Sequence, residues 1–164
     1  DQVCLENGKI QTTSGTGEAK VTQIYLTNSH GQISETFSVN EPLRLHVNVE
    51  LFASLPTLVL GYAIKDRLGQ VAFGSNTWYT NQTLFNVHSE ESYEFIIDFD
   101  IKLGIGSYSI ATALVSDETH LSHNYEWKDL ALIFHVVNDS KDSFVGYTWC
   151  NHDVQIKSIS KEAL

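Results

Sequence analysis

Trp78 and Tyr79 are the residues in this sequence whose chemistry is easiest to name. They follow Asn76 and precede Asn81, in a stretch made mostly of Asn, Thr and Gln. Aromatic faces stack on the C–H patch of a pyranose ring, and amide side chains supply the paired donors and acceptors that sugar hydroxyls need. The combination predicts a carbohydrate-binding loop. The alternative is that Trp78 only fills the end of the core, which would leave Tyr79 as the exposed aromatic residue.

A second polar stretch, residues 117–127, holds His120 and His123 among carboxylates, together with Tyr125 and Trp127. Histidine and carboxylate side chains bind metal ions, but two histidines three residues apart outside a helix have no fixed geometry. We therefore expect a polar loop that Tyr125 and Trp127 anchor to the core, with His120 available to hydrogen-bond a ligand. No metal ion and no cofactor is predicted.

The clearest alternation of apolar and polar residues runs from Leu43 to Leu51. Such alternation predicts a strand with one face in the core and the other in water. Arg44, His46 and Asn48 lie on the polar face. We include these three among the candidate ligand-binding residues.

Asp98 and Asp100 lie two residues apart in another alternating segment. Paired carboxylates carry out glycoside hydrolysis. Because Phe99 and Ile101 occupy the alternate positions, the aspartates are expected on the ordinary solvent side of a strand. No serine lies in a nucleophile-elbow motif, and neither cysteine is expected at the start of a helix, which would activate it. The chain is not expected to be an enzyme.

Residues 58–76 predict a β-hairpin at the centre of the fold. Apolar and β-branched residues fill both arms, and Asp66-Arg67-Leu68-Gly69 suits a tight turn with glycine in the left-handed conformation. No segment shows a sustained helical period. About eight short strands predict an all-β, two-sheet antiparallel β-sandwich, immunoglobulin-like or jelly-roll-like. The other strands are expected at residues 21–27, 43–51, 93–101, 108–114 and 130–137, with 144–150 and 154–159 forming one bent strand or a strand and a tail.

Two features of this arrangement bear on binding. If successive strands are antiparallel, the loops at 53–57, 75–92 and 117–129 lie at one end of the sandwich. The predicted strand at 108–114 has a reverse face of small side chains, running from Ser107 to Ala113. Small side chains let another backbone or a flat ligand approach closely.

The overall composition excludes several classes of partner. The chain has 164 residues, enough for one domain with its own core. Its net charge of −10 disfavours nucleic acid and anionic membrane surfaces, since both are negatively charged. No apolar run reaches the roughly 20 residues of a membrane-spanning helix. Cys4 and Cys150 fit either a disulfide or two thiols, and we favour free thiols.

We expect residues 1–17 to be a linker or lead-in, residues 18–157 to form the domain and residues 158–164 to be a tail. The lead-in is rich in glycine and lacks periodicity. The chain begins with Asp rather than Met and shows no signal peptide, which indicates a piece of a longer protein.

The order of several short motifs resembles that of the C-terminal domain of Wzt-type ATP-binding subunits of bacterial polysaccharide (O-antigen) ABC transporters. Each motif is a turn or core pattern, and together their order and spacing carry the resemblance over roughly residues 15–150. The motifs are Gly15-Thr16-Gly17-Glu18-Ala19, Gly31, Phe37, Glu41-Pro42-Leu43, Gly61-Tyr62-Ala63-Ile64-Lys65-Asp66-x-x-Gly69, Phe73-Gly74-x-Asn76-Thr77, Leu103-x-x-Gly106-x-Tyr108 and Tyr125-x-Trp127 before Phe134-x-Val136.

The resemblance implies a cytoplasmic β-sandwich that follows an ATPase domain, absent from this chain, and is held at the inner membrane through the transporter. It implies a non-catalytic carbohydrate-binding module that recognises the modified non-reducing end of a finished O-antigen polysaccharide before export. The implied partners are the polysaccharide chain end, the ATPase domain of the same subunit and the membrane subunit. A homodimer is also implied, with Phe144 to Ile156 as the candidate for an exchanged strand.

Two other functions remain open from the residues alone. One is a protein-interaction or dimerisation sandwich without a glycan ligand, in which a partner strand covers the small-residue face from Ser107 to Ala113. It predicts an exposed apolar strip and no aromatic-lined concavity. The other is a metal-dependent enzyme that uses His120 and His123. For a glycan with an anionic end, Arg44, Lys65 or Arg67 would have to supply positive charge against an acidic background.

Overall fold

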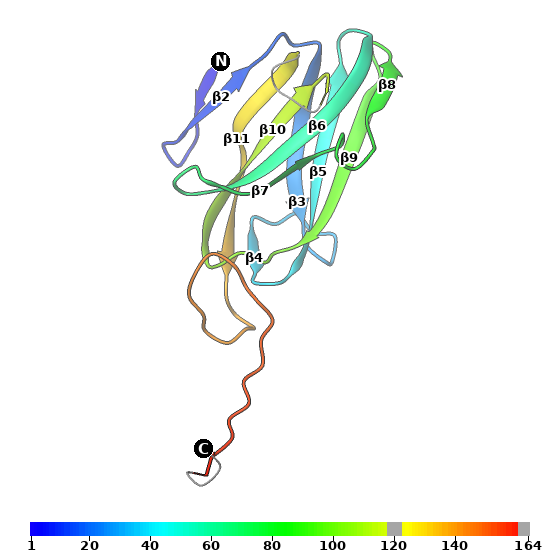
Figure 1. The fold of residues 1–164 in the computed structure, drawn as a ribbon. Coiled ribbons are helices and arrows are strands. Elements are labelled where there is room, and N and C mark those ends of the chain that lie inside the picture. The colour runs from blue at the N-terminus through cyan, green and yellow to red at the C-terminus, as the bar shows by residue number, and fades with distance from the viewer. Residues whose placement is uncertain (118–122, 161–164) are drawn as a thin grey trace.

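The chain folds as a sandwich of two antiparallel sheets, which confirms the predicted fold class. The computed structural model describes residues 1–117 and 123–160. Figure 1 shows the sheets packed face to face, with a C-terminal segment running away from one end. All regular secondary structure in the described residues is β-strand, and these residues contain no helix that could cross a membrane.

The larger sheet has eight strands in the order β1-β2-β11-β10-β6-β7, with β4 added to β11 and β8 added to β6. The smaller sheet has the order β3-β5-β9. Only the β4–β11 pair among the described strands is parallel. The strands are β1 (Gln2–Cys4), β2 (Ile10–Ser14), β3 (Ala19–Thr27), β4 (Thr36–Ser38), β5 (Pro42–Leu51), β6 (Leu55–Asp66), β7 (Val71–Asn76), β8 (Leu84–Val87), β9 (Ser92–Asp100), β10 (Gly106–Val115) and β11 (Asn124–Val137).

The predicted central hairpin is confirmed as β6 and β7. Asp66 closes the turn, because its backbone N–H donates to the Gln70 carbonyl (2.9 Å) and its carbonyl accepts from the Gly69 N–H (3.0 Å). Gly69 has a φ of 82°, a conformation that favours glycine. The turn type therefore follows from the residues that occupy it.

The core lies between the inner faces of the two sheets. On β5 the alternate residues from Leu43 to Leu51 are all buried, as the alternation predicts. They face Phe37 and Phe134, which are almost completely buried and pack edge to face with ring centroids 6.3 Å apart. The alternate residues of β9 are only half-buried. β7 and β9 are edge strands of the two sheets and line one cavity, and no described strand pairs with their outer edges, so the sandwich is open on this side.

Of the three loops expected at one end of the sandwich, the described parts do contact one another, but residues 124–129 belong to β11 and residues 118–122 lie outside the described residues. Thr57 Oγ1 donates to the Ser116 carbonyl, and the Ser89 N–H donates to Ser54 Oγ. The stretch 75–92, however, is not one loop, since it contains strand β8. The pairing of β8 with the start of β6 leaves residues 77–83 beside the larger sheet and not at its tip.

The N-terminal residues differ from the expected lead-in. Residues 2–14 form the β1–β2 hairpin, and β2 pairs with β11 at Ser14–Trp127 and Thr13–Lys128. Gln11 Nε2 also donates to the Leu130 carbonyl (2.8 Å). The hairpin has both faces largely exposed, so its sequence lacks the apolar alternation that signals a strand.

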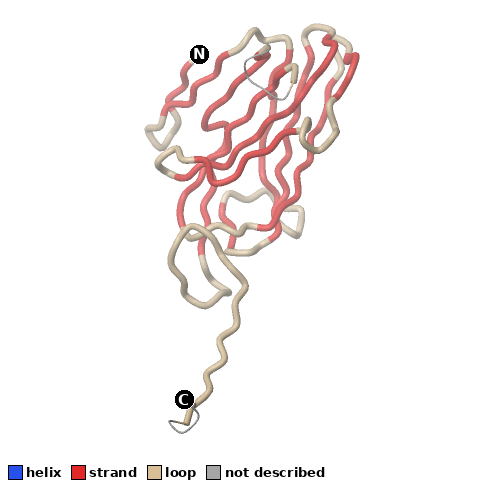
Figure 2. The backbone as a smooth tube through the Cα atoms, in the orientation of Figure 1, coloured by secondary structure: helices blue, strands red, loops and turns tan. Residues whose placement is uncertain are grey.

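The strand predicted at 144–150 is wrong, and of the two alternatives for 154–159 the structure shows a tail and not the continuation of a bent strand. No strand follows β11 in the described residues; the segment makes one isolated bridge, Leu103 to Thr148. The Trp149 side chain packs instead into the end of the core, 9% exposed, and the backbone N–H of Trp149 donates to the Lys102 carbonyl (2.7 Å). From residue 151 the described chain is exposed and leaves the body, as Figure 2 shows.

Gly104 permits this docked segment, so its substitution is a test of the packing. A Cβ at Gly104 would lie 2.3 Å from the Gly146 carbonyl oxygen, so one backbone would have to move. We expect Gly104→Ala to release residues 144–149, red-shift tryptophan emission and lower the free energy of unfolding by about 1–3 kcal/mol. Gly106→Ala is the control, because its Cβ would stand 3.8 Å from the Tyr108 ring. Identical emission and stability in the two variants would contradict this packing.

Candidate functional site

A pocket of about 270 Å³ opens on the outer face of the larger sheet. Its floor consists of two neighbouring rungs that run across three strands. In one rung Gly61 of β6 pairs with Ala113 of β10 and with Asn76 of β7. In the other, Ala63 pairs with Ala111 and Gly74. Small side chains on this floor let a flat ligand approach the backbone of the sheet closely.

Two aromatic side chains line the pocket above this floor. Trp127 comes from β11, where it pairs with Ala113 and packs against Val59 and Val115. Tyr79 comes from the loop that follows β7, and 65% of it is exposed. Trp127 is half-buried and held by its strand, whereas Tyr79 is held by its loop.

The loop carrying Tyr79 is anchored by Asn76 and Thr77 at its start. Thr77 is buried, donates its N–H to the Leu60 carbonyl (3.0 Å) and accepts the Leu60 N–H on its hydroxyl (3.0 Å). Asn76 Oδ1 accepts the backbone N–H of Tyr79 (2.8 Å). Asn81 ends the turn in a left-handed conformation, with a φ of 57°. Local hydrogen bonds therefore set where the Tyr79 ring emerges.

The structure divides the predicted ligand-binding residues between two surfaces. Asn76 and Tyr79 line the pocket. Trp78, in the same loop, is 39% exposed, which does not fit the alternative of a core plug. Asn81 is exposed at the end of that loop, and His120 lies outside the described residues. The predicted contributors from β5 lie on the opposite sheet.

On the outer face of the smaller sheet, the predicted residues are already engaged with neighbouring side chains. Arg44 makes a bidentate pair with Asp98, at 2.7 and 3.0 Å. His46 lies between Thr27 Oγ1 (2.9 Å) and Glu94 Oε1 (3.0 Å). Asn48, likewise, donates to Gln23 Oε1 (3.0 Å). A ligand on this face would have to compete with these contacts.

The Arg44 pair also bears on the carboxylates of β9. The hydrogen bonds from Arg44 lower the pKa of Asp98, which keeps this side chain ionised. A glycosidase acid needs the opposite, a raised pKa. Among the described residues, no group of three or more His, Cys, Asp or Glu is arranged to hold a metal ion. His123 instead contacts Glu18 (3.2 Å) and Thr16 (3.1 Å).

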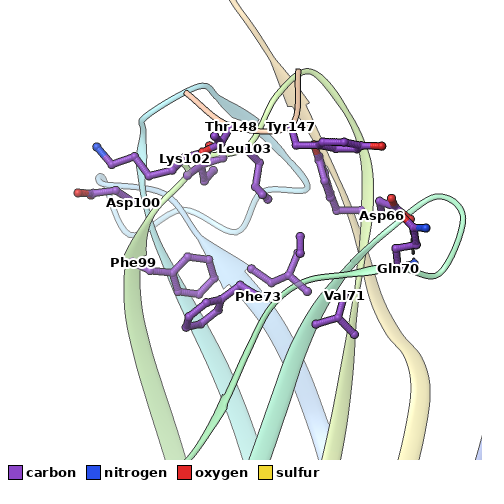
Figure 3. Close-up of a pocket in the computed structure, with 14 residues that line it drawn as sticks. Asp66, Gln70, Val71, Phe73, Phe99, Asp100, Lys102, Leu103, Tyr147 and Thr148 are labelled. Atoms are coloured by element: carbon purple, nitrogen blue, oxygen red, sulfur yellow. Dashed lines mark hydrogen bonds between the residues drawn. The ribbon is translucent and has the colours of Figure 1, made fainter. Parts of the chain in front are cut away.

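A larger cavity, of about 550 Å³, lies at the open side of the sandwich. Figure 3 shows Phe73 of β7 and Phe99 of β9 pointing into it from the two sheets, with Tyr147 of the C-terminal segment at its far wall. None of the predicted ligand-binding residues that the structure describes lines it. Its lining combines aromatic and aliphatic side chains with polar ones, which include Asp66, Gln70, Asp100, Lys102 and Thr148.

The family model described as the Wzt C-terminal domain matches residues 10–150. The chain belongs to this family. The Wzt C-terminal domain is a domain of the ATPase subunits of O-antigen ABC transporters. The resemblance expected from the motifs is thus confirmed, and the match covers the whole sandwich from β2 onward.

Comparison with solved structures supports the same fold. The crystal structure of the C-terminal domain of wzt has a TM-score of 0.78 and 16% identity, and the similarity covers 90% of this chain and 89% of that chain. The DNA glycosylase AlkC of Pseudomonas fluorescens (TM-score 0.47, 15% identity, 73% and 30% covered) and a CARDB domain from Pyrococcus furiosus (0.42, 13%, 73% and 89%) are too distant to support any inference. No curated protein sequence matches the chain.

Sequence reasoning missed part of the pocket of this Wzt C-terminal domain. Trp127 was expected as a core anchor, but Tyr125 alone is fully buried there, and Trp127 lines the pocket. Gly61 and Gly74 were recognised only as family motifs. The available signal was the small reverse face of β10, which already suggested close approach of a flat ligand. What was missing was the register that places β6 and β7 beside it.

The hydrogen bond from the Tyr79 backbone N–H to Asn76 Oδ1 can be tested by substitution. Asn76→Ala removes the acceptor, so we expect faster hydrogen exchange at the Tyr79 amide and a loss of about 0.5–1.5 kcal/mol in stability. Asn76→Asp keeps an oxygen at the same position and should preserve protection of that amide. NMR-detected exchange measures both. Unchanged protection in Asn76→Ala would show that other contacts hold the loop.

Proposed function

We propose that this chain is the glycan-recognition module of an O-antigen ABC transporter, and that the pocket receives the non-reducing end of the finished polysaccharide. The observation that carries the proposal is the small-residue floor lined by Tyr79 and Trp127. An aromatic face stacks on the apolar face of a sugar ring, and Asn76 offers amide groups at the same pocket.

The size of the pocket supports recognition of a chain end. Sites for drug-sized ligands typically enclose about 300–1,000 Å³. At about 270 Å³ this pocket suits one sugar ring and not a longer stretch of chain. Affinity is expected to be weak, because each sugar hydroxyl must give up water for each hydrogen bond it makes.

The same geometry disfavours the interaction module without a glycan. That alternative requires an exposed apolar strip on β10, whereas Ala111 and Ala113 are each only 3% exposed and lie in an aromatic-lined hollow. Membership of the family supports the remaining parts of the proposal. These are a cytoplasmic location at the inner membrane, an ATPase domain in the same subunit and a membrane subunit as partner.

Tyr79→Ala tests this function directly. We expect the variant to lose saturation-transfer NMR signal from the source organism's polysaccharide while keeping its melting temperature, because most of the Tyr79 side chain is already exposed. Signal from the native chain should be stronger for polysaccharide that carries the natural terminal modification than for polysaccharide that lacks it. Tyr147→Ala is the matched control, since Tyr147 is 77% exposed and lines the other cavity. A folded Tyr79→Ala protein with full binding would refute the role of this residue.

We also propose that the chain forms a homodimer in which the C-terminal segment of one copy lies at the open side of its partner. β7 and β9 each pair on one side only in the described residues, so both offer free backbone groups beside the larger cavity. The exposed segment carries Val154, Ile156 and Ile159, which are 73%, 92% and 68% exposed. A second copy would bury these side chains.

Removing the residues after Cys150 should therefore convert the dimer into a folded monomer. Sedimentation velocity measures this, and circular dichroism confirms that the strands remain. Val154→Ser with Ile156→Ser is the milder variant and should weaken the dimer without shortening the chain. A truncated protein that sediments as the full chain does would refute strand exchange through this segment.

A further inference from the structure

The pocket lining shares one property that constrains its ligand. Among the described residues, none of those that line it carries a charged side chain; they are Gly, Ala, Val, Ser, Thr, Asn, Tyr and Trp. The chain as a whole has a net charge of −10. An anionic sugar would therefore leave water for an uncharged hollow in an acidic protein, without a counter-ion in the lining.

A cation does lie beside the pocket, but it is already paired. Lys65 lies on β6 two residues after Ala63 and therefore on the same face of the sheet. Its Nζ lies 5.9 Å from the centroid of the Trp127 ring and 3.1 Å from Asp129 Oδ1. The Lys65 side chain is only 18% exposed. The Asp129 carboxylate thus neutralises the Lys65 charge, and the face of the Trp127 ring also attracts the ammonium group.

Asp129 occupies an irregular position of β11 that fixes it near Lys65. The β10–β11 register shifts between Ile110 and Thr112, and Leu130 has a φ of 51°. The Leu130 N–H donates to Asp129 Oδ1 (3.1 Å), the same oxygen that receives Lys65. The shape of the bulge therefore keeps the carboxylate in place.

We propose that the pocket selects an uncharged terminal sugar, and that Asp129 enforces this selection by neutralising Lys65. The inference rests on the proposed function of the same pocket. An acidic sugar could gain Lys65 as a partner only by leaving Asp129 unpaired. Exchanging one carboxylate partner of Lys65 for another adds little binding free energy. Asp129 is then a specificity-determining residue that needs no contact with the ligand.

The test uses pairs of methyl glycosides that differ only at C6. Methyl α-glycosides of D-glucose, D-galactose and D-mannose are compared with the corresponding uronic acids by saturation-transfer NMR on the full chain. We expect the neutral sugars to give at least about tenfold more signal than the acids, because the acids lack a counter-ion. Gly61→Ala should abolish the signal, since its Cβ would stand 3.6 Å from that of Ala113 and raise the floor.

Asp129→Asn tests the residue itself. Asparagine keeps the oxygen that accepts the Leu130 N–H, so the bulge is retained while Lys65 loses its counter-charge. We expect the signal from the acids to rise about threefold or more relative to the neutral sugars. Asp98→Asn is the matched control, because it changes net charge equally but frees Arg44 on the other sheet. An equal rise in both variants would overturn the role of Asp129.

The remaining outcomes separate this inference from the proposed function. Acids that bind the native chain as well as neutral sugars do, with a signal lost in Gly61→Ala, would overturn charge selection and leave glycan binding standing. Signal from none of the glycosides, or signal that Gly61→Ala does not change, would overturn the proposed function and the inference together.

Discussion

Both the sandwich and the pocket depend on the hydrogen-bonded ladder of β6. This strand pairs along its length with β10 on one side, and with β7 and β8 on the other. Its inward residues Leu58, Leu60 and Ile64 are buried in the core, whereas Gly61 and Ala63 form the middle of the outer floor. Because side chains alternate along a strand, one register serves both faces. A slip of one residue would place leucines on the floor and glycine in the core.

The polar side chains of the outer faces are largely matched to partners within the chain. Arg44 forms an ion pair with Asp98 and Lys65 with Asp129, whereas His46 hydrogen-bonds Glu94. Exposed ion pairs of this kind add little stability, but they remove free charge from the surfaces they occupy. The pocket is consequently a neutral patch on an acidic protein. In the proposed function, this separates ring recognition through stacking and amide groups from the electrostatics of the whole domain.

The open side of the sandwich is where we propose that another chain binds. Edge strands expose unpaired backbone groups and are usually blunted or covered. Here the edges of β7 and β9 lie beside an apolar cavity, while Trp149 docks the start of an exposed C-terminal segment nearby. The cavity that suits a peptide strand and the pocket that suits a sugar are lined by different residues, apart from their shared use of β6, β7 and β10. The proposed dimer and the proposed glycan recognition can therefore occur together.

The sequence alone determined the fold class, the central hairpin and the buried face of β5, because strand alternation and turn residues act over a few neighbours. It also identified Asn76 and Tyr79 as members of a polar loop with aromatic residues. The small residues of β10 were identified as a surface that a backbone or a flat ligand can approach closely. Only the tertiary structure decided that these belong to one pocket with Gly61 and Trp127, and that Arg44, His46 and Asn48 lie on the opposite sheet. Which strands become neighbours depends on pairing between residues far apart in the chain. Local patterns carry no record of that register, so the sequence provided the components of the site and the sheet determined their arrangement.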